Sequence, residues 1–309
     1  MNTKLMGHIY AFVSITIWGS TYIVSKIVLE TIMPAQVLFI RFLIASIVLT
    51  MFYPKFKKMK SIKVEALLFI TALCLLGYFV SENTALTKTY ATNVSLIVAT
   101  IPIISLIIAR FIGDKTHLNK NIIVGFIIAY LGVVVIVTVN GDRSSIKFTG
   151  DAIAFLAAIS FSFYSFVLVK VNGKYNIIHL TRNIFYYMTI LLFIYNLTKG
   201  TFTTEYYPIE EIFEFKMFLS LLFLGVVASS FSFLMWNQSI KLIGNIRTSQ
   251  YIYFGPIVTT VFAAFILNES ITIVTVMGTL MIICGVYLAE MKYKPKTKII
   301  KKSNIRCEV

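Results

Sequence analysis

Three charged side chains lie inside long apolar runs of this sequence, where a charge is costly unless it meets a partner or water. Lys26 and Glu82 stand near one end of their runs, and Arg41 lies well inside its own. Placed across a bilayer as described below, all three fall in the same half of the membrane. Glu82 is expected to bind a proton or an amine, and Lys26 or Arg41 a carboxylate. The alternative is an internal ion pair, and the sequence does not decide whether Glu82 would pair with Lys26 or with Arg41.

Aromatic and amide side chains accompany these charges. Trp18, Tyr22 and Lys26 are four residues apart and share one helical face, as do Tyr78 and Glu82. Such a face gains little from lipid, so it should turn inward, where rings would hold the apolar part of a solute and amides its polar part. Interhelical hydrogen bonding, or anchoring at the membrane surface, is the competing explanation. The residues predicted to bind a solute are Trp18, Tyr22, Lys26, Tyr78, Glu82, Asn83, Tyr164, Trp236, Asn237 and Tyr251.

Two prolines interrupt apolar runs at equivalent places, Pro102 in the first half of the chain and Pro256 in the second. Proline lacks an N–H and clashes with the carbonyl four residues back, so the carbonyls of Val98 and Ile252 should be freed. In lipid, such carbonyls must find partners or face a wet cavity. Matched interruptions in two halves favour a role in cavity shape or hinge motion over a tolerated kink.

Signatures of enzymes and metal sites are missing from the sequence. His8, His117 and His179 fall on separate segments, and the three cysteines have no metal-ligand spacing. HExxH, P-loop and GxSxG motifs do not occur, so a hydrolase or an ATP-driven pump is not expected from this chain. We therefore predict that the protein is not an enzyme and uses neither a cofactor nor a metal.

The elements that carry these residues are too apolar for a soluble protein. The chain is 58% hydrophobic and 13% charged, with a mean hydropathy of +0.85, whereas soluble domains are about 25% charged. Its formal charge of +15 does not indicate nucleic-acid binding, because the Lys and Arg residues cluster in loops beside the apolar runs. The composition predicts an integral membrane protein whose partner is the lipid bilayer.

Ten apolar runs are long enough to cross a bilayer as helices. Helices are favoured over a barrel because the runs are long and do not alternate between polar and apolar residues. The predicted spans are 7–28, 34–53, 64–84, 91–111, 121–140, 150–171, 180–198, 216–238, 246–267 and 272–291. Most of the 28 Lys and Arg residues then lie on one side, which places both termini in the cytoplasm of a multi-pass protein in the cytoplasmic membrane.

The chain also repeats itself. Gly125 and Gly132 recur half a chain length later as Gly278 and Gly285, and the two prolines match in the same way. Five spans per half is an odd number, so the halves must enter the membrane from opposite sides. The sequence predicts an all-α membrane fold with ten transmembrane helices as two five-helix inverted repeats, 1–140 and 141–291, followed by a basic cytoplasmic tail, 292–309. The glycines are expected to allow close helix packing, within the chain or between protomers of a homodimer.

Several segments together resemble a known family. "WGSTYIVSK" in the first span, "RFLIA" in the second, P-x12-E-S in the ninth and G-x6-G in the tenth are similar to the EamA-type permeases of the drug/metabolite transporter superfamily. The resemblance covers nearly the whole chain. It implies a central cavity between the two repeats, and movement of small metabolites such as amino acids or other amphipathic compounds.

The resulting hypothesis is a secondary transporter that moves a small amphipathic metabolite by alternating access, most simply as efflux, driven by protons or by the solute gradient alone. Its site would comprise the solute-binding residues above, with Pro102 and Pro256 shaping the cavity and Arg41 as an intramembrane charge. A non-transporting membrane subunit is the second hypothesis. A membrane-embedded enzyme is disfavoured, because no acid–base or metal set converges.

Overall fold

The computed structural model describes residues 3–55, 61–89, 91–111, 120–140, 148–201, 209–267 and 273–290. Within these ranges the regular elements are all helical and no strand forms. Six of the helices are long and apolar enough to cross a membrane, and two further apolar helical stretches are shorter. These observations confirm the predicted all-α membrane fold.

The helices follow the order of the predicted spans. The first half contains α1 (Thr3–Leu29), α2 (Pro34–Phe52), α3 (Ile62–Leu86), α4 (Ala91–Val98), α5 (Ile101–Phe111) and α6 (Lys120–Asn140). The second half contains α7 (Phe148–Val171), α8 (Ile177–Thr198), α9 (Ile209–Ile212), α10 (Phe215–Leu222), the π-helix η1 (Phe223–Phe231), α11 (Ser232–Ile243), α12 (Asn245–Gln250), the 3₁₀ turn η2 (Tyr251–Tyr253), α13 (Phe254–Leu267) and α14 (Ile273–Glu290). The fourth span is therefore α4 with α5, the eighth runs from α10 to α11, and the ninth from α12 to α13.

Local sequence signals set several of the helix ends. Ser61 accepts a hydrogen bond from the Lys63 amide at 3.3 Å and so caps α3. Asn176 caps α8 in the same way, accepting from the Ile178 amide at 2.9 Å. Pro34 opens α2, at a position where a missing N–H costs nothing. Gly244 ends α11 with a φ of 87°, a conformation that favours glycine.

The fourth and ninth spans are both broken beside their prolines. α4 stops at Val98 and α5 begins at Ile101, one residue before Pro102. The Ile97 carbonyl in this break accepts two hydrogen bonds from Thr100, from its amide at 3.0 Å and its hydroxyl at 2.6 Å. In the ninth span the 3₁₀ turn η2 precedes Pro256. The backbone thus departs from α-helix where proline removes a donor.

The eighth span contains a π-helical stretch that the sequence did not reveal. The Ser230 and Ser232 hydroxyls donate to carbonyls five residues earlier, at 3.0 Å each. Gly225 lies in this stretch, and a Cβ there would come within 2.6 Å of the Ile44 side chain. The missing side chain therefore lets η1 approach α2, and π-turns of this kind often mark functional sites.

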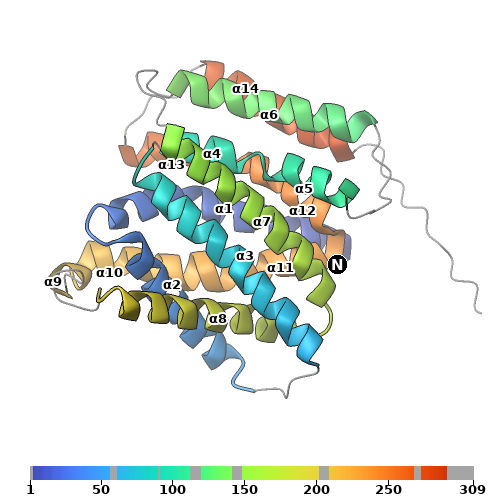
Figure 1. Cartoon of the computed structure of the whole chain (residues 1–309). Coiled ribbons are helices and arrows are strands. Elements are labelled where there is room, and N and C mark those ends of the chain that lie inside the picture. Colours follow the sequence, from blue (N-terminus) through green and yellow to red (C-terminus); the bar gives the residue numbers. More distant parts are fainter. Residues whose placement is uncertain are drawn as a thin grey trace, which may run out of the picture.

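The two halves are related by an approximate two-fold pattern of helix packing. α3 packs along α7 as α1 packs along α11, and α2 pairs with α8. α1 also contacts α13, which matches the contacts of α7 with α4 and α5. Figure 1 shows the remaining symmetric pair, α6 and α14, side by side along one edge of the bundle. With five spans in each half, this pattern is that of two inverted repeats.

Glycines hold α6 and α14 in close contact. A Cβ at Gly285 would lie 2.5 Å from the Ala129 amide nitrogen, and one at Gly132 would lie 2.6 Å from the Gly278 carbonyl oxygen. No side chain fits at these distances, so the small residues set the helix separation. The predicted packing role of these glycines is confirmed, and the close contact is between two helices of the same chain.

We expect Gly285→Leu to destabilise the protein, because overpacking a tight helix contact costs about 1–3 kcal/mol. The thermal midpoint of the purified protein in detergent should fall by about 5 °C. Cys284→Leu is the matched control, since Cys284 is exposed on the same helix and its replacement should leave the midpoint unchanged. Equal midpoints for the two variants would show that α6 and α14 separate at little cost.

Candidate functional site

A central cavity lies where the two halves meet. Its empty volume is about 550 Å³, counted out to its open mouth. On α1 the lining runs from Ile15 to Tyr22, and on α3 from Tyr78 to Glu82, so the cavity occupies the half of the bundle away from the N-terminus. The lining residues are Ile15, Trp18, Gly19, Thr21, Tyr22, Arg41, Tyr78, Phe79, Glu82, Ser95, Val98, Ile101, Phe161, Phe233, Ile252, Gly255 and Pro256.

Arg41 forms the cationic part of the lining. Its side chain is 2% exposed, its Nε–H donates to the Ser229 hydroxyl at 2.6 Å, and its guanidinium lies 4.6 Å from the centre of the Phe79 ring. Ser229 reaches it because η1 approaches α2 at Gly225. Among the described residues, Nε–H is the one donor of this guanidinium with a hydrogen-bond partner. The two terminal nitrogens therefore remain for a ligand.

Glu82 supplies the opposite charge. Its side chain is 7% exposed, and Oε1 accepts a hydrogen bond of 2.5 Å from the Tyr78 hydroxyl one helical turn earlier. The Tyr22 hydroxyl interacts with the same carboxylate. Both hydroxyls come from residues that line the cavity with Glu82. The carboxylate is thus held by two tyrosines at the edge of the cavity.

The two charges share the cavity without forming a direct ion pair within the described ranges. They attract each other electrostatically, and in a medium of low dielectric this attraction offsets part of the cost of burying both. Of the two cations that the sequence offered, Arg41 is therefore the one that shares the cavity with Glu82. Lys26 is exposed and does not line the cavity.

The broken spans form another wall of the cavity. Val98 and Ile101 flank the break in the fourth span, and Ile252, Gly255 and Pro256 come from the break in the ninth. α13 approaches α1 here, because a Cβ at Gly19 would lie 2.7 Å from Val258. Both interruptions therefore contribute residues to the cavity wall, and their role in shaping or moving the cavity stays a prediction.

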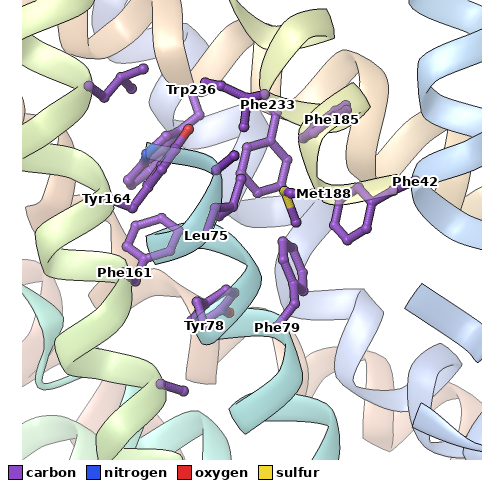
Figure 2. Close-up of a cluster of buried hydrophobic side chains, with 14 of the residues drawn as sticks. Phe42, Leu75, Tyr78, Phe79, Phe161, Tyr164, Phe185, Met188, Phe233 and Trp236 are labelled. Carbon is purple, nitrogen blue, oxygen red and sulfur yellow. The ribbon is translucent and has the colours of Figure 1, made fainter. Parts of the chain in front are cut away.

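A layer of packed rings closes the cavity on the side of the N-terminus. The Trp18 ring centre lies 4.7 Å from that of Phe233 and 5.0 Å from that of Trp236. Phe161 contacts Tyr164 and Trp236, at 5.3 and 6.0 Å. Figure 2 shows these rings of α7 and α11 gathered beside Tyr78 and Phe79 of α3. We call Trp18, Phe161, Tyr164, Phe233 and Trp236 the aromatic layer.

Hydrogen bonds fix the aromatic layer in place. The Trp18 indole donates to the Ala228 carbonyl at 3.0 Å. The Tyr164 hydroxyl donates to Asn237 Oδ1 at 2.6 Å, and the Asn237 amide donates to the Thr181 hydroxyl at 3.0 Å. These bonds join α1 to η1, and α7 and α8 to α11, so several helices hold the rings in place.

The structure brings together four of the ten residues predicted to bind a solute. Trp18, Tyr22, Tyr78 and Glu82 line the cavity, as does Arg41. Tyr164, Trp236 and Asn237 lie in or behind the aromatic layer.

The other predicted positions lie outside the cavity lining. Tyr251 is near the N-terminus, with its hydroxyl 2.8 Å from His8 Nδ1. Asn83 is fully buried, and neither polar atom of its side chain has a hydrogen-bond partner. Pro102 is buried next to Ile101, which does line the cavity.

Several lining residues were missed by the sequence analysis. Phe161 and Phe233 are ordinary apolar residues on long apolar helices, and nothing in their spacing distinguishes them. Thr21 is the exception, because it precedes Tyr22 in a polar stretch of α1 and could have been included. Ser229 belongs to a serine-rich stretch of the eighth span, which was the available signal for the partner of Arg41.

The groups that line this cavity are suited to ligand recognition. The described residues contain no group of His, Cys, Asp or Glu that could hold a metal ion. The cavity offers a guanidinium, a carboxylate, hydroxyls and aromatic rings, which together recognise charge and shape. A helical bundle with such a cavity at the meeting point of two repeats defines the class of multi-pass membrane transporters.

The comparisons with known proteins agree with this class. The model of the EamA-like transporter family matches residues 5–138 and again 148–291. The chain belongs to the EamA-like transporter family. The two matches cover the two halves that the helix packing relates.

Relatives and a solved structure extend over nearly the whole chain. An uncharacterized transporter of Archaeoglobus fulgidus is 27% identical over 94% of this chain and 99% of its own length. The uncharacterized transporter YoaV of Bacillus subtilis is 26% identical over 89% of this chain and 94% of its own. A crystal structure with a TM-score of 0.76 covers 94% of this chain and 98% of that chain at 14% identity, which is a likeness of fold. Family and relatives identify a membrane transporter rather than an enzyme.

Proposed function

We propose that this protein is a secondary transporter for a small metabolite that carries both an amino group and a carboxylate. One observation supports the proposal most strongly. Arg41 and Glu82 line the same cavity, and the two terminal nitrogens of Arg41 have no hydrogen-bond partner among the described residues. A zwitterionic solute would place its carboxylate against Arg41 and its ammonium against Glu82, and both pairs are charge-assisted hydrogen bonds.

The rest of the cavity suits the apolar part of such a solute. Trp18, Phe161 and Phe233 form its floor, while Val98 and Ile252 line its wall. Thr21 and Ser95 add hydroxyls. Pockets for small molecules commonly combine apolar walls with a few polar groups that fix orientation.

Alternating access is the proposed mechanism. The cavity lies in the half away from the N-terminus, and the aromatic layer closes the other half. Beyond that layer, the side chains of Ser165, Asn245 and Gln250 are buried and carry polar atoms without hydrogen-bond partners. Buried unpaired polar groups are unfavourable, and a second conformation that opens this side would hydrate them. The breaks at Pro102 and Pro256 are the proposed hinges.

The distribution of Lys and Arg supports a cytoplasmic N-terminus, so the cavity would face the outside in this conformation. We propose the cytoplasmic membrane as the location and efflux as the direction. Protons are the proposed coupling ion, with Glu82 taking up a proton when the solute leaves.

The experiment that tests the proposal compares metabolites in cells that overproduce the protein and cells that lack it. Zwitterionic candidates are then tested with the purified protein in proteoliposomes. The proposal expects one solute with an amine and a carboxylate to accumulate on one side faster than in empty liposomes. Transport confined to solutes that lack either group would overturn the zwitterion assignment.

A sealed, non-transporting bundle is the competing hypothesis, and thiol accessibility separates the two. After the native cysteines are replaced, Thr21→Cys should react with a membrane-impermeant maleimide added to intact cells, because Thr21 lines the cavity. Val28→Cys is the matched control on the same helix, since Val28 is fully buried in a packed cluster with Ile32 and Leu224. Equal protection of both thiols in cells and in inverted vesicles would favour the sealed bundle.

A further inference from the structure

A second and larger cavity lies on the outer surface of the bundle, between α2, α3 and α8. Its empty volume is about 1420 Å³, against about 550 Å³ for the central cavity. It opens sideways, because Leu73 and Val80 on its α3 wall are 43% and 42% exposed. These residues belong to membrane-spanning helices. The groove therefore opens toward the hydrocarbon of the bilayer.

The lining of this groove changes character along its length. Its floor is aliphatic and comes from all three helices, with Leu38, Leu76 and Leu192 among the lining residues. Its end away from the N-terminus is polar and includes Asn196 and Lys199. An apolar floor with a cationic end matches an acyl chain joined to an anionic headgroup.

A rigid polar bracket supports the cationic end. The Gln36 amide donates to the Thr201 carbonyl at 3.2 Å, and the Thr201 hydroxyl donates to Asn196 Oδ1 at 2.8 Å. The Asn196 amide in turn donates to the Leu192 carbonyl at 2.8 Å. The bracket joins the start of α2 to the end of α8, and its polar groups form hydrogen bonds with one another and with the backbone. Lys199 follows directly on α8, and no carboxylate from the described ranges lies within ion-pair distance of it.

We propose that this groove is a binding site for an anionic glycerophospholipid, with an acyl chain along the leucine floor and the phosphate beside Lys199. One argument indicates that a lipid chain fills the groove, and a second indicates that its headgroup is anionic. An open apolar groove inside a bilayer is filled by lipid chains, which are the solvent there. A lysine at the membrane surface attracts anionic lipid with an energy equivalent to about a fivefold preference.

The position of the groove gives the lipid a structural consequence. α2 packs mainly against α8 and η1 rather than against α3, so the groove separates α2 from α3 on the lipid side. These same helices carry Arg41 and Glu82 into the central cavity. A bound lipid would act as a wedge that sets the distance between the two charges. The site does not depend on the identity of any transported solute.

Native mass spectrometry of the purified full chain tests the proposal without a transport assay. The protein is titrated with phosphatidylglycerol and with phosphatidylcholine of the same acyl chains. The wild type should retain phosphatidylglycerol with about a fivefold preference. Lys199→Ala should abolish the preference while still binding both lipids. Val80→Trp, which fills the groove, should lower the retention of both.

Lys88→Ala is the matched control, because Lys88 is exposed near the same end of the bundle but does not line the groove. This variant should keep the wild-type preference. The proposal is overturned if Lys199→Ala discriminates between the lipids as the wild type does, or if Val80→Trp, folded by circular dichroism, retains as much lipid. An equal loss of preference in Lys88→Ala would also overturn it, because net charge would then explain the selectivity.

Discussion

Glu82→Gln is expected to abolish the pH dependence of transport while leaving the protein folded. The glutamine carbonyl can still accept the hydrogen bond that Tyr78 donates to Glu82 at 2.5 Å, so the local packing is kept. The side chain can no longer exchange a proton or offer a charge to an ammonium group. In the wild type, a proton on Glu82 competes with the ammonium, so apparent affinity should fall as the pH is lowered. In the variant the affinity should be weak at every pH.

The measurement is the initial rate of solute uptake into proteoliposomes, from mildly acidic to mildly alkaline pH. Glu65→Gln is the matched control. Glu65 is also a buried carboxylate on α3, bound by the Tyr175 and Tyr187 hydroxyls at 2.6 and 3.1 Å, but it lies outside the cavity lining. That variant should keep the wild-type pH profile. A Glu82→Gln protein with an unchanged profile would show that Glu82 is a structural residue.

The membrane fold could be predicted from the sequence because lipid restricts the choices. A chain in hydrocarbon must satisfy its backbone internally, so ten long apolar runs predict ten helices. The matching of Pro102 to Pro256 then indicated two repeats. The π-helix η1 could not be predicted, because it depends on Gly225 meeting Ile44 of another helix. Its effect is large, since it brings Ser229 to Arg41.

The charged part of the site was also visible in the sequence. Burying Arg41 and Glu82 is costly, so their occurrence inside apolar runs indicated a shared environment. Lys26 shares the helical face of Trp18 and Tyr22, but it lies in the last turn of α1. A lysine there can extend to the membrane surface, and its exposed position is consistent with that. Helical spacing shows which face of a helix carries a residue, but it does not show how deep in the membrane that residue lies.

The aromatic layer shows why aromatic and amide residues were harder to assign to the solute-binding site. Tyr164, Trp236 and Asn237 were grouped with the solute-binding residues because polar and aromatic groups should turn inward. They do turn inward, but they pack against one another below the cavity. Whether an inward face lines a cavity or fills it depends on the shapes of several helices at once, and one sequence does not contain that information.

Arg41→Gln is expected to weaken binding of a zwitterionic solute by about 10- to 150-fold, the range for losing a hydrogen bond to a charged group. The informative measurement is competition by each amino acid and by its carboxamide derivative. The wild type should prefer the free carboxylate, because the terminal nitrogens of Arg41 would bind it in a bidentate manner. The variant should bind both compounds alike. A variant that still prefers the carboxylate would contradict the assignment of Arg41.

Arg182 provides the control that separates recognition from folding. It is as deeply buried as Arg41, but it donates to the Tyr53 and Lys55 carbonyls and lies outside the central cavity. Arg182→Gln should therefore lower the thermal midpoint without changing the preference for carboxylate over carboxamide. Arg41→Gln should also lose stability, since it leaves Glu82 without its compensating charge.

The double variant Arg41→Gln, Glu82→Gln then tests whether the two charges act as a pair. Each charge compensates the other, so removing both should destabilise the protein by less than the sum of the single changes. The double variant should also fail to bind zwitterions, because neither charged end would find a partner. Additive losses of stability would mean that Arg41 and Glu82 do not interact energetically. The proposal that one site holds both ends of a single solute would then be contradicted.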